Sequence, residues 1–264
     1  MRFRFQRKYL CIPYALFLVL FVILPILMIV YYAFTDAAGN FTFEALISFF
    51  TSTSKLNVLV NSLMFSILNT LICLLIGYPL AYLLSNKKYN KNAVLVMLFV
   101  TPMWINFVLR TWATRDVLNW LGIGGGNSPY VATMIGLVYN YLPFVVLPLY
   151  TTMLKLDKSQ IEASINLGCN KFQVFTKSII PQSIPGIVSA SMMVFMPTMS
   201  SYVISDVLSE GKITLFGNSI YLSFANSQWS QGSFMAMLML VIIGISMLLT
   251  RNFTEKDEER GAKW

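Results

Sequence analysis

The chain has 264 residues, of which 56% are hydrophobic and only 11% are charged, and its net charge is +8. Soluble domains carry roughly a quarter charged residues, so this composition excludes an ordinary soluble protein and indicates a membrane protein. The sequence contains no histidine, which excludes a histidine general base and an imidazole metal site.

Six charge-poor apolar segments can each hold a helix that crosses the hydrocarbon core, which takes about 20 residues. In chain order, we expect spans at 10–34, 58–84, 93–113, 131–154, 183–207 and 233–250. The first segment is too long for the core of a signal peptide and has no convincing small-residue cleavage site after it, so it is interpreted as an uncleaved span. The expected fold class is all-α, a polytopic membrane protein with six transmembrane helices in one domain, residues 1–264.

The basic residues are unevenly divided between the two sides of the membrane. One side would carry Arg2, Arg4, Arg7, Lys8, Lys87, Lys88, Lys91, Lys155, Lys158, Lys171, Lys177, Arg251, Lys256, Arg260 and Lys263. The other side would carry Lys55, Arg110, Arg115 and Lys212. Because the richer side is normally cytoplasmic, both termini are expected inside the cell. Topology and contact with membrane lipid headgroups explain these charges, so no nucleic-acid partner is expected.

The residue inventory contains little catalytic chemistry. Cys11, Cys73 and Cys169 are scattered over two spans and a loop, which fits reduced, packed thiols better than a disulfide framework or a zinc cluster. The glycine-rich segment 122–126 superficially matches a phosphate loop, but no Lys-Ser or Lys-Thr follows, so a flexible outer loop is expected. We therefore expect no catalytic residue, no metal site and no cofactor held by this chain.

The segment from Asp157 to Pro181 is a polar interruption between two long apolar stretches. Asp157 is a good N-cap for a first helix, and Gly168 is expected to end that helix, because a left-handed C-cap position favours glycine. Asn170, with Gln173 three residues on, can cap a second helix that Pro181 ends. From these residues alone, packing of this hairpin on its own membrane domain and docking to a partner are about equally good explanations.

The apolar residues of the hairpin give each helix one apolar side. Ile161, Ala163, Ile165 and Leu167 would line the first helix. Phe172, Phe175, Ile179 and Ile180 would line the second.

The spacing of this hairpin resembles a known signature. Glu162-Ala163-Ser164, followed at fixed intervals by Gly168, Phe175 and Pro181, is similar to the EAA signature of the membrane subunits of bacterial ABC importers. The match departs from the usual alanine, isoleucine and leucine at Ser164, Ser178 and Ile180. Further blocks resemble the spermidine/putrescine permease branch of these importers, at 77–79, 101–106, 135–139, 142–144, 148–150, 156–158, 180–181, 185–186 and 202–206.

The resemblance implies a MetI-like transmembrane domain of a type I importer in the bacterial plasma membrane. It would pair with a second, homologous permease subunit, bind two copies of a cytoplasmic ABC ATPase that hold ATP and Mg, and receive polyamine from an extracytoplasmic binding protein. The cytoplasmic EAA loop, 157–181, would couple to the ATPase through Glu162, Ala163, Ser164, Gly168, Phe172, Phe175 and Pro181. The chain itself would be a transport subunit and not an enzyme.

Two alternatives remain for the function at this point. One is an importer of the same architecture that carries a different small solute. The other is a stand-alone secondary transporter, which usually shows intramembrane ionisable residues for ion coupling; the expected spans contain essentially none.

A polyamine is a flexible polycation, so its pathway should offer aromatic faces and carboxylates. The candidates are Trp104, Asn106, Tyr139, Asn140, Tyr202 and Asp206. Each of them also fits an interfacial anchor or an interhelical hydrogen bond. No acidic residue lies deep in an expected span, which favours weak, transient contacts over a stable cation site.

Overall fold

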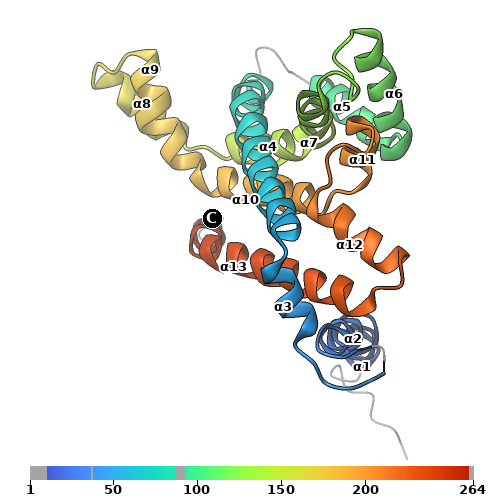
Figure 1. The fold of residues 1–264 in the computed structure, drawn as a ribbon. Helices are drawn as coiled ribbons and strands as arrows, with labels where there is room; N and C mark the ends of the chain where they lie inside the picture. The colour runs from blue at the N-terminus through green and yellow to red at the C-terminus, as the bar shows by residue number, and fades with distance from the viewer. Residues whose placement is uncertain (1–10, 37, 87–92, 262–264) are drawn as a thin grey trace, which may run out of the picture. The chain divides into compact units, whose positions relative to one another are not determined.

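The structure is a computed structural model (Figure 1), and it describes residues 11–36, 38–86 and 93–261, with side chains described between 12 and 250. The basic residues at the N-terminus and at 87–91, on which the predicted orientation depends in part, lie outside these ranges. The described residues are almost entirely helical, as predicted, and Thr35 forms an isolated antiparallel bridge with Phe41.

The helices follow one another with short connections. In chain order they are α1 (Cys11–Leu18), η2 (Val19–Ile23), α2 (Leu24–Ala33), α3 (Glu44–Thr51), α4 (Thr53–Ser85), α5 (Val94–Val100), η3 (Thr101–Trp104), α6 (Phe107–Trp120), α7 (Pro129–Leu154), α8 (Lys158–Asn166), α9 (Lys171–Val174), η4 (Phe175–Ile179), α10 (Ile180–Ser200), α11 (Val203–Ser209), α12 (Phe216–Ala225) and α13 (Trp229–Gly261). The elements η2 and η4 are π-helical turns, and η3 is a 3₁₀ turn.

Within the described ranges, five helices are long and apolar enough to cross a membrane. They are Ile12–Ala33, Thr53–Ser85, Pro129–Leu154, Lys171–Ser200 and Trp229–Thr250. The pair Val94–Trp104 and Phe107–Trp120 passes the same test together, although it is bent by 94°. The described part of the chain therefore has five candidate spans, or six if the bent pair forms one.

The bend divides the segment that was expected to form one continuous helix over 93–113. Ile105 has an extended backbone, and Asn106 then caps α6 by accepting a hydrogen bond from the N–H of Val108 at 2.9 Å. Pro102 lies in the 3₁₀ turn just before the break. A proline lacks a backbone donor and an asparagine N-cap starts a new helix, so the local sequence favours an interruption here.

The expected fifth span, 183–207, begins and ends elsewhere. A continuous helix runs from Lys171 to Ser200 through α9, η4 and α10, so the prediction that Pro181 ends the second cytoplasmic helix is wrong. The π-helical turn Phe175–Ile179 ends two residues before this proline, and the wider turn accommodates a residue that lacks a backbone donor. At the other end, Ser201 is extended and α11 begins at Val203.

The contacts divide the chain into two compact units, 1–56 with 219–242 and 57–218 with 243–264. In the first unit, Nζ of Lys55 donates to Ser48 Oγ at 3.0 Å and to Gln231 Oε1 at 2.8 Å. The ring of Phe49, which is buried, lies 5.6 Å from that of Phe234. These contacts hold α3 and the start of α13 together.

In the second unit, α4, α7 and α10 pack closely around a shared hydrophobic core. A Cβ atom at Gly77 would lie only 2.8 Å from Cγ1 of Val145, so glycine permits the close approach of α4 and α7. Asn69 donates to Thr198 Oγ1 at 2.8 Å, which joins α4 to α10. Interhelical hydrogen bonds of this kind satisfy polar groups that lipid cannot.

Candidate coupling and translocation sites

The helical hairpin of α8 and α9, which leads into η4 and α10 (Figure 1), begins at a capped end. As predicted, Asp157 is the N-cap of α8: its Oδ1 accepts hydrogen bonds from the Ser159 hydroxyl at 2.7 Å and from the Ser159 N–H at 2.9 Å. These bonds hold the pKa of the Asp157 carboxyl below its usual value. The N–H of Asp157 donates to Gln182 Oε1 at 3.1 Å, which ties the start of the hairpin to α10.

The corner of the hairpin is a glycine C-cap of the Schellman type, which confirms the prediction that Gly168 ends the first helix. Gly168 has a φ of +81°, in the left-handed region. The N–H of Gly168 donates to the carbonyl of Ile165 at 2.9 Å, and that of Cys169 donates to Ser164 at 3.2 Å. These two bonds satisfy carbonyl groups that the helix end would otherwise leave without partners.

A capping box starts α9, also as predicted. The Asn170 N–H donates to Gln173 Oε1 at 2.9 Å, and the Gln173 N–H donates to Asn170 Oδ1 at 2.8 Å. The two caps and the glycine corner together define the path of the chain between Asp157 and α9 through local hydrogen bonds.

Near its corner the hairpin carries three exposed apolar side chains, Ile165, Leu167 and Phe172, which are here together called the tip patch. These side chains are 55%, 85% and 73% exposed. Glu162 and Ala163 on α8 are exposed as well. The apolar side predicted for the first helix is therefore exposed at Ala163, Ile165 and Leu167. An exposed apolar patch on a small polar element is typical of an interaction surface.

The remaining predicted coupling residues have different surroundings. Ser164 Oγ donates to the carbonyl of Gln160 within α8, and Pro181 lies exposed at the start of α10. The ring of Phe175 is half-buried against Tyr78 and Tyr82 of α4. The predicted single apolar side of the second helix is thus divided, because Phe172 points to the outside and Phe175 points to the bundle.

A second candidate site surrounds Arg110 in α6, which is only 8% exposed. Its Nε donates to Asn140 Oδ1 at 2.9 Å and its Nη1 donates to the carbonyl of Pro102 at 3.0 Å. The guanidinium carbon lies 5.5 Å from the centre of the Tyr139 ring. Burial of a charge is costly unless the charge is paired or hydrogen-bonded, and these three contacts offset that cost.

Arg110 was not among the residues predicted to form a site. It lies inside the expected third span, and the statement that the spans contain essentially no ionisable residue is wrong at this position. An arginine inside an apolar segment is itself a signal of a functional or structural site within a membrane domain. That signal was available in the sequence.

The six predicted pathway residues fall into two groups. Asn106, Tyr139 and Asn140 gather at the bend, as the cap of α6 and as partners of Arg110. Trp104, Tyr202 and Asp206 are exposed, the first at the end of η3 and the other two at the start of α11. The α11 helix packs against both α6 and α7.

An apolar groove of about 560 Å³ runs beside Arg110. It is lined by Ile105, Leu109, Arg110, Ala113, Thr114, Val117, Leu118, Ile135 and Tyr139. A single cation stands among otherwise uncharged residues in this lining, so the groove does not have the carboxylates that would hold a polycation.

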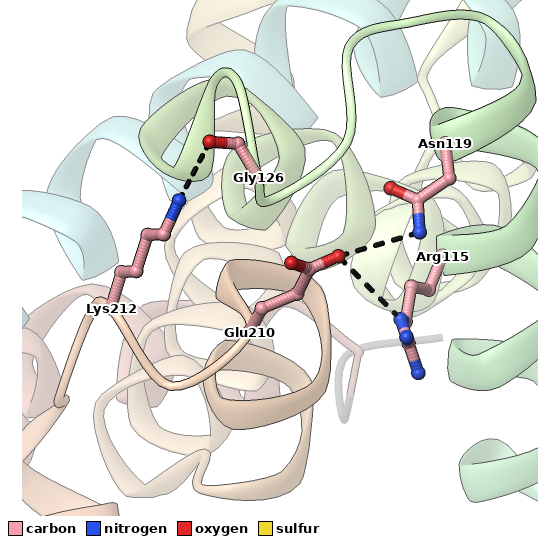
Figure 2. A network of polar contacts seen from close by, with 5 residues as sticks. All are labelled: Arg115, Asn119, Gly126, Glu210 and Lys212. Atoms are coloured by element: carbon pink, nitrogen blue, oxygen red, sulfur yellow. Dashed lines mark hydrogen bonds and ion pairs between the residues drawn. The ribbon is translucent and has the colours of Figure 1, made fainter.

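At the Pro129 end of α7, polar contacts connect α6, the glycine-rich segment and α11 (Figure 2). Glu210 Oε1 lies 3.9 Å from Arg115 Nε and accepts a hydrogen bond from Asn119 Nδ2 at 3.4 Å. Nζ of Lys212 donates to the carbonyl of Gly126 at 2.6 Å. The segment that was expected to be a flexible loop is therefore attached to the end of α11. Across the described residues, no three His, Cys, Asp or Glu side chains meet where they could hold a metal ion.

The chain belongs to the family described as the binding-protein-dependent transport system inner membrane component, whose family model matches residues 74–256. The fold and the family together define the class: a multi-pass, inner-membrane permease subunit of an ABC importer with a MetI-like transmembrane domain. Such a subunit is a non-catalytic transport component, and it assembles with a separate ATPase and a binding protein.

Particular relatives match most of the chain. It is 33% identical to the spermidine/putrescine transport system permease protein PotB of Escherichia coli strain K12 over 253 residues, which cover 88% of this chain and 92% of the relative. It is also 33% identical to the PotB protein of Haemophilus influenzae, over 94% of this chain and 96% of that protein.

The fold is similar to solved ABC importers. A bacterial transporter that imports the acidic polysaccharide alginate matches with a TM-score of 0.70 and 15% identity, over 94% of both chains. The MetNI methionine transporter in an inward-facing conformation matches with a TM-score of 0.56 and 16% identity, over 78% of this chain and 98% of that one. At these identities the likeness concerns the fold.

Proposed function

We propose that this chain forms half of the pathway through which an ABC importer moves polyamines, spermidine or putrescine, into the cell. The observation that carries the cargo assignment is the 33% identity, over 88–94% of the chain, to permeases named for spermidine and putrescine. The other half of the pathway belongs to a second, homologous permease subunit, and a polyamine-binding protein delivers the cargo from outside.

The EAA loop, residues 157–181, is the proposed contact with the ATPase. The tip patch, with the exposed Glu162 and Ala163 beside it, offers an apolar surface next to a rigid corner. A short amphipathic helix that lies in a groove of a partner is a recurrent docking mode. Two copies of the ATPase bind ATP and Mg, and their closure moves the docked loops, so that rigid-body rocking of the spans switches access to the pathway.

This assignment also sets the orientation. The hairpin at the Leu154 end of α7 lies in the cytoplasm, and both termini lie on the same side, in agreement with the excess of basic residues there. The contacts at the Pro129 end of α7 then face the outside, where the binding protein arrives.

Cargo contacts within this half of the pathway are weak in this proposal. Trp104, Tyr202 and Asp206 are exposed and remain pathway candidates. Asn140 is engaged by Arg110, and one face of the Tyr139 ring is occupied by its guanidinium. A fixed cation beside them disfavours a stable polyamine site at the bend, so the binding protein supplies most of the selectivity.

The test is reconstitution in liposomes of this chain with its second permease subunit, its ATPase and its binding protein. ATP-dependent uptake of labelled spermidine or putrescine, in preference to methionine or an alginate oligosaccharide, supports the proposal. ATP-dependent uptake of a different solute, without uptake of a polyamine, would support an ABC importer and contradict the polyamine assignment. Uptake by this chain without an ATPase would instead identify a secondary transporter.

A further inference from the structure

Three aromatic rings join the EAA loop to the membrane bundle. The Phe175 ring lies 5.6 Å from the Tyr78 ring at an interplanar angle of 83°, and 5.7 Å from the Tyr82 ring at 76°. Both contacts are edge-to-face, the geometry that the ring quadrupoles favour. One ring at the base of the hairpin is therefore held by two consecutive turns of α4.

We propose that these three residues, here called the aromatic clasp, carry the movement of the docked loop to α4, and that Phe175 is a positioning residue and not an ATPase contact. The inference rests on the proposed function, because it presupposes an ATPase bound to the tip patch. It deepens that function by separating residues that bind the ATPase from residues that transmit its motion.

The two phenylalanines of the loop have contrasting surroundings. Phe172 is 73% exposed, whereas Phe175 is half-buried between rings and is flanked by Val174 and Ile179, which are both buried. A ring that is covered by its own domain offers little area to a partner. Phe172 is thus available for docking, and Phe175 is committed to α4.

The clasp is connected further into the bundle. The Tyr78 side chain is 9% exposed, and its hydroxyl forms a 2.7 Å hydrogen bond with Ser183 Oγ of α10. A displacement of Phe175 therefore acts on α4 through the ring contacts, and it acts on α10 through η4, which continues directly into α10. Packed side chains have discrete arrangements and low compressibility, so they transmit displacement where a solvated contact would yield.

The second attachment of the hairpin is of a different kind. The Asp157 N–H donates to Gln182 Oε1 at 3.1 Å, in an exposed position. This bond connects the hairpin to α10, the helix into which the loop already leads. The clasp reaches α4, which is distant in sequence, and two of its rings are shielded from solvent, Tyr78 being buried and Phe175 half-buried.

The experiment uses the full complex with its second permease subunit, ATPase and binding protein. Phe175→Leu and Tyr82→Leu are compared with Phe172→Ala by co-purification of the ATPase and by stimulation of ATP hydrolysis by the loaded binding protein. We expect Phe175→Leu to retain the ATPase but to lower stimulation and uptake together, by at least about fivefold for the loss of two ring pairs. Phe172→Ala should lose the ATPase itself. Phe175→Tyr keeps the aromatic ring, so its stimulation of ATP hydrolysis should be close to that of the wild type and higher than that of Phe175→Leu.

A matched control exists in the other compact unit, where Tyr31 and Tyr32 form an edge-to-face pair at the same 5.6 Å separation. Tyr31→Leu should leave stimulation unchanged. Loss of the ATPase from Phe175→Leu to the same extent as from Phe172→Ala would overturn the inference, as would unchanged stimulation in Phe175→Leu. If Phe175→Leu fails to insert into the membrane, Tyr82→Leu tests the inference in its place, because Tyr82 is 38% exposed and lies at the edge of the clasp. If the wild-type complex retains no ATPase, both the proposed function and the inferred role of the clasp are wrong. If ATP hydrolysis by the complex is stimulated by a different cargo, only the polyamine assignment is wrong.

Discussion

Replacement of Gly168 tests the proposed coupling role of the hairpin most directly. The residue has a φ of +81°, and a Cβ atom built on it would meet nothing within 4 Å. Within this chain, a substitution here therefore acts through the backbone conformation and not through a clash of the added Cβ atom. For any residue with a Cβ atom, the left-handed conformation costs about 1–2 kcal/mol, and β-branched residues tolerate it least.

The magnitude follows from that cost. A penalty of about 1–2 kcal/mol lowers the population of the correct corner by roughly 5- to 30-fold, since about 1.4 kcal/mol corresponds to a factor of ten. We expect Gly168→Val to insert normally but to lose ATPase co-purification and ATP-dependent uptake to this extent. Gly168→Asn should lose much less, because asparagine tolerates the left-handed region.

Gly186 provides a contrasting glycine. A Cβ atom there would clash with the Thr152 side chain in the packed bundle, so Gly186→Val should reduce the amount of folded protein in the membrane. The measurements are membrane yield, co-purified ATPase and initial uptake rate. Normal uptake by Gly168→Val, or equal defects in the Val and Asn variants at this position, would refute the argument from backbone conformation.

Three further predictions follow from the two candidate sites. Arg110→Leu leaves Asn140 Oδ1 without its donor and removes one of the two donors to the Pro102 carbonyl, which also accepts from the Ile105 N–H. Thermal unfolding in detergent should therefore show a loss of about 1–3 kcal/mol, and an unshifted midpoint would contradict the inferred hydrogen bonds. Asp206→Asn should lower the maximal rate of polyamine uptake while ATPase binding stays constant; unchanged kinetics would remove this residue from the pathway. The hydrogen bonds from Ser159 lower the pKa of the Asp157 carboxyl in the folded chain. The contribution of this N-cap to stability is therefore complete at pH values above the ordinary carboxyl pKa of about 3.9, and it is lost as the pH falls through the lower pKa of the folded chain. Proteolysis of the hairpin should accordingly be constant from about pH 5 to 8 and rise only below about pH 4, whereas Asp157→Ala should be cleaved faster throughout; equal cleavage of the variant would exclude a capping role.

The sequence by itself determined those features that depend on neighbouring residues. The apolar segments, the N-cap at Asp157, the glycine corner and the capping box of Asn170 and Gln173 all follow from hydrophobic length or from hydrogen bonds within a few residues. The signature around Glu162 belongs to the same local hairpin.

Only the tertiary structure decided which side chains face the bundle. Asn140 lies 30 residues from Arg110, and Tyr78 lies 97 residues from Phe175, so no local pattern links these partners. Burial depends on which helices pack together, and a pattern of apolar residues alone does not distinguish a ring that meets α4 from one that meets an outside partner. For this reason Phe172 and Phe175, three residues apart, were predicted to share one side, and the packing of α4 separates them.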